Sequence, residues 1–148
     1  MSIYMETTSI PAEETVAQIQ RILGRYGASA IMTEYEDGNI KALSFKVRCG
    51  EVEVPFRLPC RHEAVYTILA AKKRKFRSDT EDKLKVQAKN VAWRQILRWI
   101  EAQMALVETS MVKMQEVMMP YIQVDLNGRT LFEKMESGKF LEFKRGDH

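Results

Sequence analysis

The sequence predicts an α+β fold, in which a three- to four-stranded antiparallel meander packs with an N-terminal helix and a C-terminal layer built on a long helix. Three observations indicate this fold. Apolar residues recur at helical spacing before position 27, alternate with polar ones between 29 and 58, and return to helical spacing from 59 to 119. The 148 residues are the size of one domain, so we expect a single domain over residues 1–148.

The first helix is predicted to follow the segment "TSIPAEE" at 8–14. Its Ser or Thr cap, early proline and two acids are typical of a helix start. The apolar residues at helical spacing are Val16, Ile19, Ile22, Leu23 and Tyr26. Gly27 then suits a left-handed stop at the C-terminal end. A short strand at 3–5 is expected before this helix.

Three strands are predicted at 29–35, 40–48 and 51–58, separated by the turn segments "EDGN" and "CG". Because side chains alternate between faces, the apolar ones of the last two strands share one side of the sheet. They are Leu43, Phe45, Val47, Val52, Val54, Phe56 and Leu58. Pro55 cannot donate a ladder hydrogen bond, so the third strand is expected at an edge or bulged.

Helical spacing returns at 59–75, with Val65, Ile68 and Leu69 expected to face the core. A further helix start is predicted at Ser78, which has capping-box spacing with Glu81. The following segment, 82–108, lacks proline and glycine. Its apolar stripe consists of Trp93, Ile96, Leu97, Ile100, Met104 and Val107.

This helix would span roughly 30 residues, or about 45 Å, which is longer than a domain of this size needs. We therefore expect part of it to pack against another copy. The methionine-rich segment at 109–119 suits either packing in the chain's own core, which we favour, or an oligomer contact. After Pro120 the chain is expected to form a short strand, an "NG" turn and a last helix capped by Thr130 with Glu133.

The residues with catalytic or metal-binding chemistry are few. The chain has two histidines, His62 and the terminal His148, and two cysteines, Cys49 and Cys60. These residues form no paired-ligand zinc motif, and no phosphate loop or dinucleotide fingerprint is present. A nucleophilic pair would have to use His62 with Cys60 or with a distant serine. We expect a protein that is not an enzyme, with no catalytic residues, no metal site and no cofactor.

The two cysteines are predicted to stay reduced. Ten extended residues separate them by roughly 30 Å, whereas a disulfide needs Cα atoms within about 7 Å. Free thiols fit a reducing cytosol. The chain contains neither a secretory signal nor an apolar run of about 18 residues, so a cytoplasmic location without membrane contact is expected.

Positive charge is concentrated between residues 72 and 89. This segment contains eight basic and three acidic residues, an excess of five positive charges in a chain whose formal net charge is +3. In "AKKRKFR", Phe76 lies beside Arg77 and is suited to stacking on a base while guanidinium groups contact phosphate. The alternative is a solvated helix end, where cations suit the negative end of the helix dipole.

A second basic feature lies in "AWRQILRW". Arg94 and Arg98 are i, i+4 neighbours away from the apolar stripe and suit an anion clamp, whereas Trp93 is expected in the core. Arg57 and Arg61 would face the same groove if the long helix covers the sheet edge. The candidate ligand-binding residues are Arg57, Arg61, Phe76, Arg77, Arg94 and Arg98.

Several segments resemble small proteins encoded by bacteriophages and prophages. They are "TVAQIQRILGRYGASAIMTEY", "VPFRLP", "VAWRQILRWIEAQMALVE" and "PYIQVDLNGRTLFE". The resemblance extends from Thr15 to Phe132 and carries no motif from which binding residues can be transferred. Phage proteins of this size include sponges that sequester cyclic nucleotide or ADP-ribose immune signals, such as the Thoeris and CBASS anti-defence proteins. The resemblance implies a role of this kind.

These observations together predict an oligomeric protein that binds and sequesters a phosphate-bearing nucleotide and counteracts host immune signalling. One alternative is a single-stranded nucleic-acid-binding accessory of phage recombination or replication, which would use the same residues along an extended track. Another is an inhibitor or scaffold that binds a protein through the methionine-rich surface.

Overall fold

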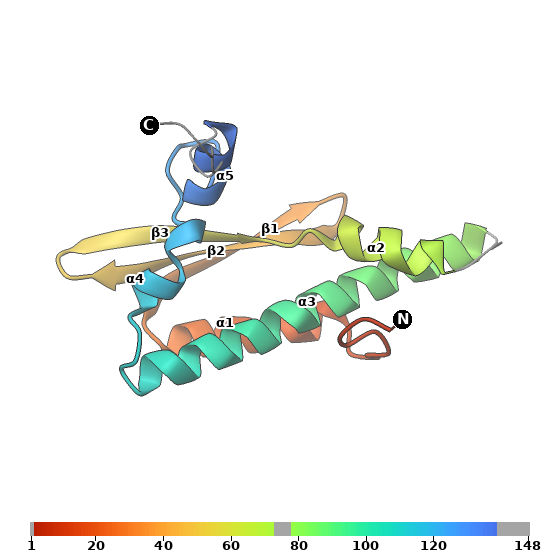
Figure 1. Ribbon diagram of the computed structural model, residues 1–148, viewed down its shortest axis with the longest axis horizontal. Helices are drawn as coiled ribbons and strands as arrows, with labels where there is room; N and C mark the ends of the chain where they lie inside the picture. The colour runs from red at the N-terminus through yellow and green to blue at the C-terminus, as the bar shows by residue number, and fades with distance from the viewer. Residues whose placement is uncertain (1, 73–77, 139–148) are drawn as a thin grey trace, which may run out of the picture.

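The computed structural model describes residues 2–72 and 78–138 and has the predicted α+β architecture (Figure 1). A helical layer covers one face of a three-stranded sheet, and the C-terminal segment reaches the other face. The elements in chain order are α1 (Ala12–Arg25), β1 (Ala28–Glu36), β2 (Asn39–Cys49), β3 (Val52–Pro59), α2 (His62–Ala71), α3 (Ser78–Glu108), α4 (Met114–Val117), the 3₁₀ helix η1 (Met119–Tyr121) and α5 (Leu131–Ser137).

The sheet is an antiparallel meander in the order β1-β2-β3. Leu43 pairs with Leu58, and Phe45 pairs with Phe56, whose ring stacks on it at 5.3 Å between centroids. All four side chains are buried, which confirms the predicted apolar face. β3 is an edge strand, as Pro55 indicated.

The core lies between this face and the helices α1 and α3. The predicted apolar stripe of the long helix packs in the chain's own core. Its almost completely buried members are Trp93, Leu97, Ile100 and Met104. α1 and α3 run in the same direction, because Ala12 contacts Asn90 and Tyr26 contacts Glu108. α3 has 31 residues, as expected.

The chain after α3 crosses the edge of β3. The amide of Gln123 donates to the carbonyl of Pro55, and Ile122 forms an isolated bridge with Phe56. The predicted fourth strand is therefore reduced to single bridges. The last helix has the predicted capping box, since Thr130 accepts from the amide of Glu133 and the Glu133 carboxylate accepts from the amide of Thr130.

Some local predictions are wrong. Residues 4–7 form a turn instead of a strand, and Met5 has a φ of 64° there. α1 begins after Pro11 without a side-chain cap of its own; Asn90 of α3 accepts from the first helical amide instead. Val52 and Ile68, expected in the core, are 63% and 45% exposed: Val52 is the first residue of β3, and Ile68 faces outward from α2 beside the buried Leu69.

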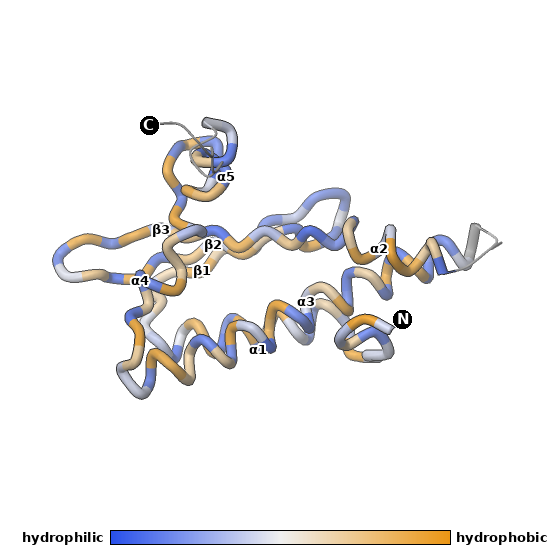
Figure 2. Tube along the Cα trace, viewed as in Figure 1, coloured by the Kyte–Doolittle hydropathy of each residue, from blue (hydrophilic) through white to orange (hydrophobic). Residues whose placement is uncertain are grey.

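α3 begins at Ser78, as predicted, whereas the Ser78 side chain and the stretch 73–77 lie outside the described residues. Hydrophobic and hydrophilic residues are mixed along every helix (Figure 2). Across residues 2–72 and 78–138, no helix is both long and apolar enough to cross a membrane.

Candidate functional site

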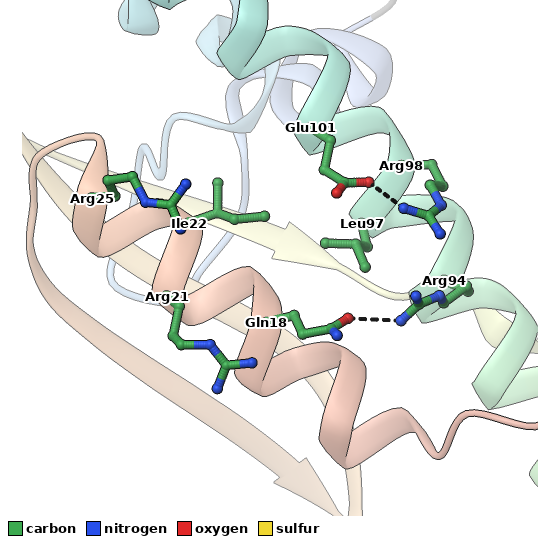
Figure 3. A pocket seen from close by; sticks show the side chains of 8 residues that line it. All are labelled: Gln18, Arg21, Ile22, Arg25, Arg94, Leu97, Arg98 and Glu101. Atoms are coloured by element: carbon green, nitrogen blue, oxygen red, sulfur yellow. Dashed lines mark hydrogen bonds and ion pairs between the residues drawn. The ribbon is translucent and has the colours of Figure 1, made fainter.

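A basic groove runs between α1 and α3 on the side of the helical layer that faces away from the sheet (Figure 3). Its volume is about 260 Å³. Residues at spacings of three and four on both helices line it, because such residues share one face of a helix. They are Gln18, Arg21, Ile22 and Arg25 from α1, and Arg94, Leu97, Arg98 and Glu101 from α3.

Arg94 is the buried charge of this groove. Only 6% of the residue is exposed, and its Nη1 donates to Oε1 of Gln18 at 2.7 Å and to Oγ1 of Thr15 at 3.3 Å. Both acceptors are neutral, and no described carboxylate lies within ion-pair distance. Its Nε is buried and has no hydrogen-bond partner among the described residues. A guanidinium held in this way is a ready partner for an anion.

Arg98 lies one turn further along α3 and is half-buried. Its Nη1 donates to Oε1 of Glu101 at 2.7 Å, and this hydrogen bond raises the pKa of Arg98. In Figure 3 the Arg94 guanidinium points across the groove to Gln18, whereas that of Arg98 lies along α3 beside Glu101. The structure thus brings the predicted i, i+4 pair into one groove.

Two arginines that the sequence analysis missed complete the lining. Arg21 and Arg25 of α1 are exposed and form no ion pair with any residue the structure describes. The groove therefore contains four guanidinium groups and one carboxylate. Their i, i+4 spacing matches that of Arg94 and Arg98, a signal that was available in the sequence. Only the packing of α1 on α3 shows that the two pairs face each other.

The groove continues toward the C-terminal end of α1 in a second hollow of about 200 Å³. This hollow shares Ile22, Arg25 and Glu101 with the first and adds Tyr26, Met104, Ala105 and Glu108. The Tyr26 hydroxyl donates to Oε2 of Glu108 at 3.0 Å, which raises the pKa of Tyr26. The basic half of the groove thus adjoins an aromatic side chain and hydrogen-bond acceptors.

Arg57 does not reach this groove. It lies between the inward-facing Phe56 and Leu58 and therefore projects from the opposite face of the sheet. Its Nε donates to Oε2 of Glu34 at 2.9 Å, and its aliphatic part lies 3.6 Å from the position a Cβ would take at Gly128. The expected convergence of Arg57 with the helix arginines is wrong, because α3 covers the inner face and not the sheet edge.

Arg61 lines a different cavity, on another side of α3. This cavity has a volume of about 470 Å³ and lies among β3, α2, α3 and η1. Trp99 and Tyr121 form an edge-to-face pair in its wall, with ring centroids 5.7 Å apart. Arg61 and the groove arginines therefore do not converge on one ligand. The other two candidates, Phe76 and Arg77, lie outside the described residues.

The residues considered for catalysis, Cys60 and His62, lie in surroundings that do not activate them as a nucleophilic pair. Burial raises the pKa of the Cys60 thiol to about 12, so it carries no thiolate at neutral pH. His62 lies beside Glu63, with 3.5 Å between Nε2 and Oε1. Within the described ranges, no three His, Cys, Asp or Glu side chains gather as metal ligands.

The fold and the groove define the class of this protein as an α+β domain with an arginine-lined groove between two parallel-running helices. Comparison of the chain with protein-family models, with curated proteins and with solved structures finds no match. The likeness to phage proteins therefore stays a prediction from the sequence segments.

Proposed function

We propose that this protein is a non-catalytic binder of a phosphate-bearing nucleotide and that the α1–α3 groove holds the phosphate. The observation that carries the proposal is Arg94, a buried guanidinium with an unsatisfied Nε and no carboxylate partner among the described residues. A charge buried this way costs stability unless an anion accompanies it, and a phosphate in the groove would supply the opposite charge beside the guanidinium.

Arg98 and Glu101 would regulate access to this position. Arg98 has donors beyond the one given to Glu101, so it can contact a phosphate on the side facing Arg94. The Glu101 carboxylate repels the same phosphate, because it lines the same groove. Arg21 and Arg25 add positive charge from the opposite helix and neutralise a second phosphate group.

The size of the groove favours a small nucleotide over an extended polymer. At about 260 Å³ the basic half is smaller than a typical small-molecule site, whereas with the adjoining 200 Å³ hollow it enters the usual range of roughly 300–1,000 Å³. In this arrangement the nucleoside lies beside Tyr26, and Glu108 accepts hydrogen bonds from its hydroxyl or amino groups.

The proposal includes sequestration of the ligand. A cyclic nucleotide or a cyclic ADP-ribose isomer fits the requirements of compact phosphate and aromatic base. A protein that binds such a signal without converting it lowers the free concentration in proportion to its own abundance. In a phage this activity would counteract host immune signalling, which is the role that the sequence resemblance implies.

Calorimetry with cyclic dinucleotides, cyclic trinucleotides, cyclic ADP-ribose isomers and inorganic phosphate tests the proposal. We expect micromolar or tighter binding of at least one nucleotide, with affinity reduced about tenfold or more in Arg94→Met and Arg98→Met, because each loses a charge-assisted hydrogen bond. Arg61→Met, outside the groove, should bind as the wild type does. Absence of binding to the whole panel would contradict the proposal.

Glu101→Gln provides a gain-of-binding test. The amide keeps the shape of the side chain but no longer repels phosphate, so the affinity should rise by about threefold to tenfold. Single-stranded oligonucleotides form a separate arm of the experiment. If they bind tightly with a steep salt dependence and Arg94→Met leaves that binding intact, the protein is a nucleic-acid-binding protein and the proposed nucleotide site in the groove is wrong.

A further inference from the structure

The two edges of the sheet differ. The edge of β3 is covered by residues 122 and 123, which bridge to Phe56 and bond to the Pro55 carbonyl. The outer edge of β1 pairs with no strand in the part of the chain that the structure describes. A nine-residue strand therefore presents a row of backbone donors and acceptors to its surroundings.

β1 has the usual protection of an edge strand mainly near its ends, where two glutamates and the register shifts lie. Its sequence, ASAIMTEYE, contains no lysine, arginine or proline. The register with β2 shifts only near the ends, between Ala28 and Ala30 and between Glu34 and Tyr35. The central residues 30–34 are consequently regular and available for pairing.

Two large apolar side chains of β1 are uncovered. Met32 is 60% exposed and Tyr35 is 63% exposed, although the strand is ordered by β2 on its other side. Exposed apolar side chains beside an unpaired strand edge are typical of a surface that binds another strand.

We propose that β1 pairs antiparallel with β1 of a second copy of this chain, around a twofold axis at Met32, to form a continuous six-stranded sheet. An antiparallel pair about this residue opposes the regular segment 30–34 to itself, with Ala30 opposite Glu34 of the second copy, and the same register places Ala28 opposite Glu36. Each acid therefore meets a small neutral residue and never another acid.

The same register matches side-chain size. The two Met32 side chains meet at the axis, Ile31 lies opposite Thr33, and Ser29 lies opposite Tyr35. Moving the axis to Glu34 would oppose two carboxylates and leave residues 28–31 unpaired. Axes at Ile31 or Thr33 also oppose no two acids but pair fewer residues of the strand, so the register centred on Met32 is the most complete one for a second copy of this chain.

This surface differs from the methionine-rich segment that the sequence suggested as a subunit contact. Met114 and Met118 are buried in the chain's own core, and Met111 and Met119 are exposed there at 68% and 49%. The dimer proposed at β1 is independent of the ligand proposed for the α1–α3 groove, which lies on the helical layer.

Disulfide trapping tests the register. In Met32→Cys, made in a Cys49→Ser background, the two new thiols face each other across the axis, with Cα atoms about 4.5–5.5 Å apart and within disulfide range. Mild oxidation should convert most of the protein to a covalent dimer. Ala30→Cys in the same background should remain uncrosslinked, because its partner is Glu34. Equal crosslinking of both variants would overturn the proposed register.

Light scattering coupled to size exclusion tests the surface itself. The wild type should be a dimer, and Met32→Lys should be a monomer because two ammonium groups would meet at the axis. Met32 is exposed, so circular dichroism should show an unchanged fold. Met111→Lys is the matched control and should remain dimeric. A monomeric wild type at about 100 μM, or a dimer lost only in Met111→Lys, would overturn the proposal.

Discussion

Arg94 donates a 2.7 Å hydrogen bond from Nη1 to the side-chain carbonyl of Gln18, and this contact joins the guanidinium of α3 to a neutral amide of α1. The same guanidinium has a buried Nε without a partner among the described residues. The interface between the two helices thus contains a charge that their own packing does not neutralise. This combination is unfavourable for stability and favourable for anion binding.

Replacing this charge should therefore stabilise the unliganded protein. Arg94→Met keeps a side chain that reaches as far as the position of Nε and removes both the unpaired charge and the unsatisfied Nε. This gain should exceed the loss of the hydrogen bonds to Thr15 and Gln18, so we expect the free energy of unfolding to rise by about 1 kcal/mol. Urea unfolding in a low-salt buffer without phosphate measures this difference.

Added phosphate should make the wild type more stable than Arg94→Met, the opposite of the order without phosphate. Added phosphate should raise the unfolding midpoint of the wild type but not that of Arg94→Met, because binding to the folded state shifts the equilibrium. Arg98→Met, in which a half-exposed side chain is changed, should alter the unfolding free energy by less than about 0.5 kcal/mol. A large loss of stability in Arg94→Met would show that the guanidinium is structural.

The Glu34–Arg57 pair should stabilise the sheet. Arg57 Nε and the Ser44 hydroxyl both donate to Glu34 Oε2 at 2.9 Å, and both charged side chains are less than a quarter exposed. Glu34→Gln should lower the free energy of unfolding by about 1 kcal/mol, between the values for exposed and buried pairs. Glu36→Gln, at an exposed pair with Lys41, is the control and should cost less than about 0.5 kcal/mol.

This pair should also produce a pH dependence. Partial burial raises the pKa of Glu34, but the hydrogen bonds from Arg57 and Ser44 outweigh it, and the net pKa is lowered from 4.5. The stabilisation by this pair is therefore present above pH 4.5 and is lost as the pH falls through the lower pKa that Glu34 has in the folded state. Urea titrations between pH 6 and pH 3 should show a smaller loss of stability in Glu34→Gln than in the wild type.

The two thiols should differ in reactivity. Cys60 is 5% exposed and its pKa is raised to about 12 by burial, whereas Cys49 is partly accessible. At pH 8, Ellman's reagent should modify one thiol per chain quickly and the second only when denaturant is added. The Cys49→Ser variant should then show no fast phase, and a fast phase in that variant would contradict the burial of Cys60.

The capping box of α5 should hold the C-terminal segment in place. Thr130 is buried and accepts from the Glu133 amide, so Thr130→Ala should cost about 1 kcal/mol of local stability. Hydrogen exchange should quicken at residues 131–137 and remain unchanged in β2. Glu136→Ala, an exposed position on the same helix, serves as the control. Equal exchange in the two variants would show that the cap does not restrain the helix.

The sequence was most informative where local chemistry decides the structure. Gly27, Gly50 and Gly128 have the positive φ angles that their stop and turn positions required. The alternation of apolar and polar residues identified the buried face of β2, and the capping-box spacing of Thr130 with Glu133 identified the start of α5. Sequence patterns were less informative at Val52, the first residue of β3, and at Ile68 of α2, both of which are exposed.

The candidate site could be predicted only in part. The i, i+4 spacing places Arg94 and Arg98 on one helix face from sequence alone, and both line the groove. Arg57 and Arg61 carry the same charge but lie on the other sheet face and in another cavity. Distances between elements depend on how the elements pack, and no local pattern encodes them.

The sequence by itself determined most of the helices and strands of this protein, their order and the apolar face of the sheet, because hydrophobic periodicity and turn chemistry act over a few neighbouring residues. Only the tertiary structure decided that α1 packs beside α3, that Arg21 and Arg25 line one groove with Arg94 and Arg98, and that no described strand pairs with the outer edge of β1. The groove joins residues far apart in the sequence: Gln18 and Arg94 are 76 positions apart. Their meeting follows from the burial of two helices against one sheet face, which is a property of the whole fold.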